Sequence, residues 1–339
     1  MLLFWDLKGL LNSLFVTVFV FSFLGQKEPV KIDDFRDSLV LYTDVGFSTA
    51  PFQISYPYPT GFSKIQYKNN FRTIIGIGFA YKWLSFRIGL PLQDRIKSDV
   101  LYGKTKQLNF NADYSFKKYY IDLEFRSLVG YAIKDAYKWD STLSSETPNK
   151  ILPNASALNF GLNGYYFHNK QFKMPALIGR RSHYNGEVRS LSLRLSLNVF
   201  GIDNNHVSFT PIPLQLQNNS ITRISRLESF EIGLIPGYVY VNRIKNWQFS
   251  GIMGVGGVIQ AKYYSHDGIS RGFLGLAPRF DIHLAGGYSC KSFFVFILTD
   301  FDNKSLAFFD LKYSQNFYSI KISGGYRFSQ PKKLSKLIN

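Results

Sequence analysis

Long stretches of the chain alternate strictly between apolar and polar side chains. Between residues 107 and 116 every second residue is apolar, from Leu108 to Phe116. Between residues 191 and 199, four leucines and a valine alternate with serine, arginine and asparagine. Successive side chains of a β-strand point to opposite faces, whereas a helix repeats about every 3.6 residues. The pattern therefore predicts an all-β chain whose strands each have one apolar face.

Twelve segments carry this alternation, and we expect each to be a strand. They lie near residues 38–48, 72–83, 84–92, 105–116, 119–131, 156–167, 188–200, 229–243, 247–263, 273–288, 291–303 and 312–328. A soluble β-sandwich would also alternate, but its strands usually have about 5–6 residues, and several of these are far longer. Short connections alternate with long ones, which is typical of outer-membrane barrels. The sequence predicts an antiparallel transmembrane β-barrel of about 12 strands (12–14), with short periplasmic turns and long extracellular loops.

The start of the chain predicts export. Residues 14–24 form an apolar run of eleven residues, preceded by Lys8. This run suits a signal peptide and is short for a membrane-spanning helix, which needs about 20 residues. We expect residues 1–25 to be a cleaved signal peptide, 26–37 a periplasmic linker, 38–328 the outer-membrane barrel of a Gram-negative bacterium and 329–339 a basic tail. An uncleaved anchor is the alternative.

Composition excludes several classes of function. A single cysteine, Cys290, excludes a disulfide scaffold and a cysteine-rich metal site, and we expect neither a metal nor a cofactor. The formal charge of +17 comes from 40 lysines and arginines against 23 acidic residues. These basic residues are scattered over strands and turns, so we expect no nucleic-acid partner. The phosphates of lipopolysaccharide and other outer-membrane lipid are the expected partners, with other envelope proteins as further candidates.

Several short motifs, taken in order, resemble a known family. They are Gly76-Ile-Gly-Phe-Ala-Tyr-Lys-Trp83, Tyr102-Gly-Lys-Thr-Lys106, Tyr120-Ile-Asp122, Glu231-Ile-Gly-Leu-Ile-Pro-Gly-Tyr-Val-Tyr240 and Gly325-Tyr-Arg-Phe328. In this order they are similar to domain-of-unknown-function family 4421, outer-membrane proteins of the Bacteroidota, and the resemblance covers roughly residues 39–328. The resemblance implies an outer-membrane β-barrel. It implies no substrate and no catalytic residue.

Two sets of ionisable residues are expected to face the lumen. Asp122, Glu124 and Arg126 share one strand face, and Arg279, Asp281 and His283 share another. An unpaired charge inside a narrow barrel is costly, so we expect an ion-pair network in which Arg279 contacts a carboxylate. A polar pore lining and a catalytic His–Asp pair are the alternatives. No serine or cysteine nucleophile is tied to such a pair.

A basic cluster lies between the predicted strands 156–167 and 188–200. Arg180, Arg181 and His183 stand close together, and we expect them in a solvated turn. Contact with a lipid phosphate, or with the lumen as part of a plug, is the alternative.

The sequence thus predicts a non-enzymatic barrel with a structural or accessory role in the cell envelope and a polar, charge-paired lumen. A narrow channel for small polar solutes is the first alternative, and a lipid-modifying outer-membrane enzyme is the second.

Overall fold

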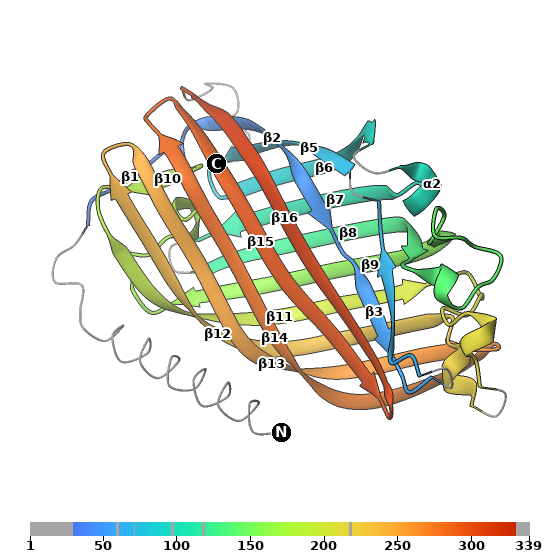
Figure 1. Ribbon diagram of the computed structural model, residues 1–339. Coiled ribbons are helices and arrows are strands. Elements are labelled where there is room, and N and C mark those ends of the chain that lie inside the picture. The colour runs from blue at the N-terminus through green and yellow to red at the C-terminus, as the bar shows by residue number, and fades with distance from the viewer. Residues whose placement is uncertain are drawn as a thin grey trace, which may run out of the picture.

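The computed structural model describes residues 30–58, 61–70, 72–95, 98–116, 119–216 and 219–329, and twelve strands close into an antiparallel barrel (Figure 1). The strands are β2 Leu39–Thr49, β5 Arg72–Tyr81, β6 Leu84–Arg95, β7 Lys106–Ser115, β8 Tyr119–Ile133, β9 Lys150–Phe167, β11 Val188–Asp203, β12 Arg226–Ile244, β13 Trp247–His266, β14 Ile269–Ser289, β15 Phe293–Phe308 and β16 Leu311–Phe328. Each strand pairs with the next, and β16 pairs with β2 to close the ring. Each also corresponds to one of the twelve predicted segments, so the fold class is confirmed. The expected signal peptide, and the tail apart from residue 329, lie outside the described residues.

The apolar side chains of the strands point outward and the polar ones inward, as the alternation in the sequence predicts. On β11 the side chain of Leu195 is 47% exposed, while its neighbour Ser196 is 2% exposed and points into the lumen. Exposed aromatic residues gather at the end where the short turns lie, where Tyr288 contacts both Trp247 and Phe293. Such rings are typical of the membrane–water interface of a barrel. Within the described ranges, no helix is long and apolar enough to cross a membrane.

A short hairpin narrows the barrel at its long-loop end. It consists of β3 Phe52–Ser55 and β4 Lys64–Lys68, and it bridges β16 and β8. At this end the strands β3 and β4 connect β16 to β8, whereas over the rest of the wall the four longer strands β2, β5, β6 and β7 lie between them. We did not predict this hairpin, because its two strands are too short to show a clear alternation. The remaining short elements are β1 Ile32–Asp34, β10 Ser182–Tyr184, α2 Asp99–Tyr102, η1 Ala136–Lys138, η2 Met174–Ala176, η3 Ile212–Leu214 and η4 Ser220–Arg223.

An apolar cluster fills the lumen at this end. The ring of Phe52 stacks on that of Tyr67, with centroids 4.4 Å apart, and Tyr67 donates a hydrogen bond of 2.8 Å to the carbonyl of Phe209. Phe209 belongs to the β11–β12 loop, which also contributes Leu214 and Ile221 to the cluster. The long-loop mouth is therefore packed with side chains.

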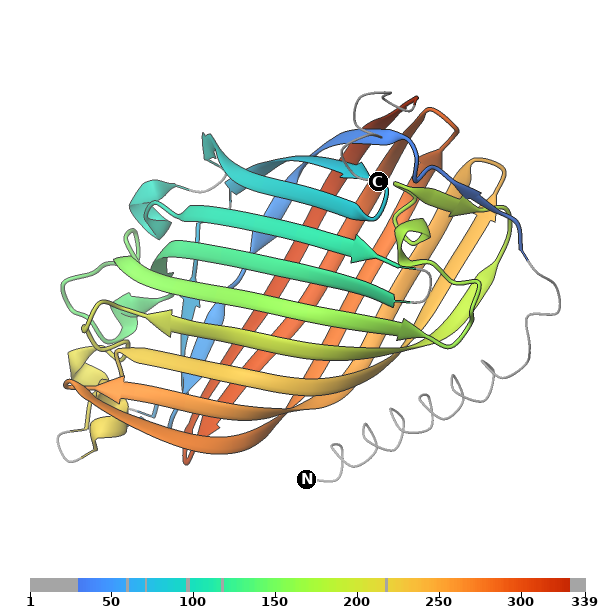
Figure 2. The same ribbon diagram turned by 180° about the vertical axis from the view of Figure 1, so that it is seen from behind.

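A folded segment occupies the opposite mouth. Residues 168–187 connect β9 to β11 at the short-turn end, so the expectation of short turns alone at this end is wrong for this one connection. Gln248, which points inward from β13, donates hydrogen bonds of 2.8 and 3.0 Å to the carbonyls of Ala176 and Leu177. We call residues 168–187 the plug. Its strand β10 pairs with β1 in a separate two-stranded sheet beside the barrel end (Figure 2).

Candidate functional site

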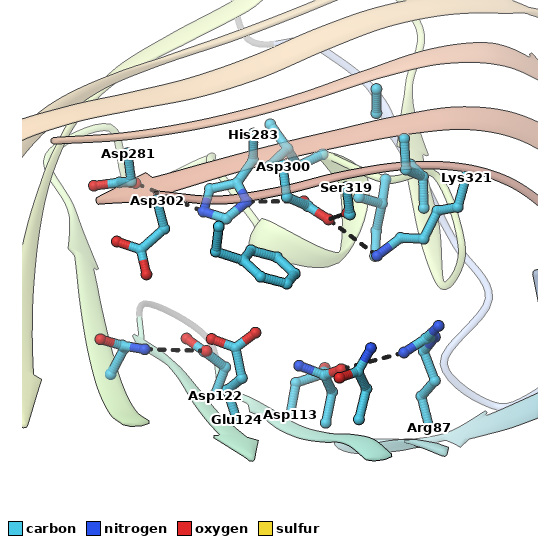
Figure 3. Close-up of a pocket in the computed structure, with 18 of the residues that line it drawn as sticks. Arg87, Asp113, Asp122, Glu124, Asp281, His283, Asp300, Asp302, Ser319 and Lys321 are labelled. Carbon is cyan, nitrogen blue, oxygen red and sulfur yellow. Dashed lines mark hydrogen bonds and ion pairs between the residues drawn. The ribbon is translucent and has the colours of Figure 1, made fainter. Parts of the chain in front are cut away.

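A polar cavity of about 210 Å³ lies in the lumen between the plug and the apolar cluster of the long-loop mouth. Both predicted sets of lumenal residues line it, the first from β8 and the second from β14. Figure 3 shows Asp122 and Glu124 on one side of the cavity and Asp281 and His283 on the other. The lumen is therefore polar in its middle, and an apolar cluster fills its long-loop end.

Arg279 contacts a carboxylate, as expected, but its partner is a residue that we did not predict. Glu231 of β12 receives hydrogen bonds from two nitrogens of the guanidinium, with a distance of 3.2 Å from Nε to Oε2. The two residues are 2% and 0% exposed. Gln260 of β13 also donates to Glu231, so both carboxylate oxygens are engaged. This pair is a buried structural contact.

Asp281 and His283 belong to a longer chain of contacts. Asp281 forms an ion pair with Arg194 of β11, and its Oδ2 lies 3.6 Å from Nε2 of His283. Nδ1 of His283 lies 2.9 Å from Oδ1 of Asp300 on β15. The other oxygen of Asp300 lies 3.0 Å from Nζ of Lys321. Carboxylates therefore flank the imidazole on both sides, with a hydrogen bond at Nδ1 and an ion-pair contact at Nε2.

The residues on β8 pair mainly among themselves. Glu124 contacts Arg126, and the guanidinium of Arg126 lies 3.4 Å from the centroid of the Phe317 ring. Asp122 accepts a hydrogen bond of 3.3 Å from Asn163. Among the residues that the structure describes, Asp122 has no cation within ion-pair distance. The two predicted sets thus share a cavity without forming an ion pair with each other.

One further pair in the cavity was missed by the sequence analysis. Arg87 of β6 donates two hydrogen bonds of 2.6 Å to the two carboxylate oxygens of Asp44 on β2. Strand β5 lies between them, and Gly76 occupies the position opposite Asp44. A Cβ atom at Gly76 would lie 2.6 Å from both partners. Asp44 is the one charged residue of β2, and the other charges of β6, Asp94 and Arg95, lie at its far end, so no local charge pattern marked the pair.

The basic cluster on the plug is buried, so the expectation of a solvated turn is wrong. Arg181 is 3% exposed and forms an ion pair with Asp113 of β7. The guanidinium of Arg180 lies 4.1 Å from the centroid of the Tyr42 ring on β2. These contacts attach the plug to the barrel wall, which corresponds to the plug alternative.

His183 joins the plug to the chain segment before the barrel. Its Nε2 lies 3.0 Å from Oδ2 of Asp33 in β1. Burial lowers the pKa of His183 to about 4, with a further contribution from the nearby positive charge of Arg243, and the contact with Asp33 only partly offsets both. The imidazole is therefore neutral near pH 7, and Nε2 donates the hydrogen bond to the carboxylate.

The described residues offer no metal site, because no group of three or more histidine, cysteine, aspartate and glutamate side chains among them is placed to hold an ion. The charged groups of the lumen instead bind one another.

The fold is similar to solved outer-membrane barrels at low sequence identity. The outer-membrane protease OmpT of Escherichia coli has 11% identity and a TM-score of 0.39, with 87% of this chain and 98% of that chain covered. The translocator domain of the autotransporter NalP of Neisseria meningitidis has 12% identity and a TM-score of 0.40, with 86% and 88% covered.

No curated protein matches the sequence. A family model matches residues 35–328, which include the whole barrel. The chain therefore belongs to the family described as a domain of unknown function, DUF4421.

Proposed function

We propose that this protein is a non-enzymatic, non-conducting barrel with a structural or accessory role in the outer membrane. The observation that carries the proposal is the closure of both mouths by packed side chains. At the long-loop end, Phe52, Tyr67 and Phe209 belong to one buried cluster. At the other end, Phe172 and Leu177 of the plug pack against barrel residues. We expect these two clusters to block the passage of solutes.

The charge pairing of the lumen supports the same proposal. Arg279, Arg194 and Arg87 each contact a carboxylate from a different strand. Removing one partner of such a buried pair is strongly destabilising, because it leaves an uncompensated charge. A lumen built in this way holds distant strands in one arrangement.

The polar cavity is the observation that favours the alternative of a narrow channel for small polar solutes. Its volume of about 210 Å³ would become part of a path only if both mouths opened. Swelling of proteoliposomes in isotonic sugar or amino-acid solutions tests this alternative. We expect no swelling above that of protein-free liposomes, whereas solute-dependent swelling would favour the channel.

A lipid-modifying activity is the remaining alternative. Comparing the lipid mass spectra of cells with and without the protein tests it, and we expect identical acyl-chain patterns. We further propose outer-membrane lipid and lipopolysaccharide as partners, since the chain carries a formal charge of +17. Export with removal of residues 1–25 is part of the proposal, and N-terminal sequencing of the mature protein tests it.

A further inference from the structure

The barrel wall is incomplete between β14 and β15. Their backbone pairing runs from Ser289 and Phe294 up to Asp281 and Asp302, and there it ends. Both strands nevertheless continue toward the long-loop end. On its other side β14 stays paired with β13 as far as Ile269, and β15 stays paired with β16 as far as Phe308. We call residues 269–280 of β14 and 303–308 of β15 the seam.

The two hairpins separate at the seam. In both views the tip of the β15–β16 hairpin diverges from the tip of the β13–β14 hairpin (Figures 1 and 2). Pro278 stands on β14 within the seam and has no backbone N–H to offer a neighbouring strand. The proline therefore weakens any ladder that would close this part of the wall.

Polar side chains form hydrogen bonds with backbone groups of the seam that have no neighbouring strand. The backbone N–H of Phe280 donates a hydrogen bond of 2.7 Å to the side-chain oxygen of Asn303. Gln260 of β13 donates one of 2.9 Å to the carbonyl of Ser305, and Lys262 of β13 donates to the carbonyl of Ala307. An unsatisfied backbone group facing lipid costs several kcal/mol. These contacts engage three of the backbone groups that have no strand partner in the seam.

The seam begins within the membrane. Eight residues separate Asp281 from the end of β14 at Ser289. Since a strand rises about 3.3 Å per residue and tilts by about 40°, the seam begins roughly 20 Å above the short-turn end of the strand. The apolar band of such barrels is about 25 Å tall. The seam therefore opens in the outer leaflet and continues beyond it.

The outward face of the seam is apolar. Leu274 and Leu276 point outward from β14 and are 82% and 81% exposed. They extend the lipid-facing surface to which Ile259 of β13 also belongs, opposite Leu276. On the lumenal side, Leu306 and Phe308 of β15 belong to the apolar cluster of the long-loop mouth.

We propose that the seam is a binding site for an acyl chain of an outer-leaflet lipid. The lipid-facing surface leads directly into the break, and Leu306 and Phe308 lie behind it, beside the side chains of Gln260 and Lys262. A polypeptide that added a strand to the seam is disfavoured, because the carbonyls of Ser305 and Ala307 are already bonded and Pro278 lacks a donor. The proposal adds a lipid site to the structural role, and it does not depend on whether the lumen conducts.

A tryptophan placed behind the seam reports the entry of lipid. In full-length mature protein with Trp83, Trp139 and Trp247 replaced by phenylalanine, we would compare Leu306→Trp with Leu128→Trp. Both leucines are buried and point inward, but Leu128 lies behind a wall that is paired on both sides. The probe is phosphatidylcholine brominated on its acyl chains, in vesicles without other protein. We expect a loss of fluorescence for the variant at 306 and none for the variant at 128.

A disulfide that closes the seam provides the second arm of the experiment. Continuing the register of Asp281 and Asp302 would bring residue 278 opposite residue 305. In a Cys290→Ser background, we expect oxidation of Pro278→Cys with Ser305→Cys to abolish the quenching at 306 and reduction to restore it. Equal quenching at 306 and 128 in correctly folded protein would overturn the proposal. A protein cross-link at Ser305 in cells, without quenching at 306, would overturn it in favour of a strand-adding polypeptide.

Discussion

Glu231 on β12 and Arg279 on β14 form a buried ion pair across the strand that separates them. The distance from Nε of the arginine to Oε2 of the glutamate is 3.2 Å. On the intervening strand β13, the residue opposite Arg279 is Gly256. The pair thus links β12 directly to β14, two strands that the backbone ladder connects only through β13.

A double-mutant cycle on this pair measures its contribution to stability. We expect the single variants Glu231→Leu and Arg279→Met each to lower the free energy of unfolding by about 3–5 kcal/mol, because each leaves one buried charge unpaired. The double variant Glu231→Leu with Arg279→Met should cost less, because neither charge remains. Urea unfolding in detergent micelles or vesicles gives the four free energies. A coupling energy within error of zero would contradict the ion-pair account.

The glycine beneath the Asp44–Arg87 pair should also be sensitive to substitution. At Gly76 a methyl group would lie 2.6 Å from atoms of both side chains, whereas at Gly164 it would meet nothing within 4 Å. We expect Gly76→Ala to cost about 1–3 kcal/mol, the usual penalty for overpacking. Gly164→Ala is the control and should change the unfolding free energy little. Equal effects of the two alanines would show that the space above Gly76 is not required by the pair.

The strands could be predicted from sequence because their alternation is local. Leu195 and Ser196 face opposite ways simply because they are neighbours in a strand. The partner of Arg279 could not be predicted, since Glu231 reaches it across β13 and the register between distant strands sets that distance. The plug has no periodic pattern, so its burial was also missed. In the seam, Pro278 was the one local signal of a break in pairing.

An arginine substitution at a lipid-facing site and at a water-exposed site tests which surface of the barrel faces the membrane. Leu195 on β11 and Ile212 in the β11–β12 loop are 47% and 83% exposed. We expect Leu195→Arg to cost about 2–4 kcal/mol, because the side chain faces the middle of the bilayer. Ile212→Arg should stay within about 0.5 kcal/mol, as is usual at a water-exposed site. Heat-modifiable folding on gels gives the first readout. A larger penalty at position 212 would mean that the barrel is oriented differently in the membrane.

Attachment of the plug to β1 should weaken in acid. The pKa of His183 is about 4 in the folded protein, against an ordinary value of 6.5, because of burial first and the charge of Arg243 second. A lowered pKa means that the unfolded segment binds a proton more readily, so its contribution to stability is complete above pH 6.5 and is lost as the pH falls toward 4. Hydrogen exchange of the β10 amides as a function of pH measures this. His183→Gln is the control and should remove the change between pH 6.5 and 4, and persistence of that change would assign it to another group.

Single-channel recording in planar bilayers tests the central claim of a closed lumen most directly. Purified protein whose folding has been verified by heat modifiability should give no conductance steps in symmetrical salt. A variant whose plug, residues 168–187, is replaced by a short turn should also remain silent, because the cluster around Phe52 and Tyr67 still fills the other mouth. Reproducible steps from the unmodified protein would contradict the account and favour a channel.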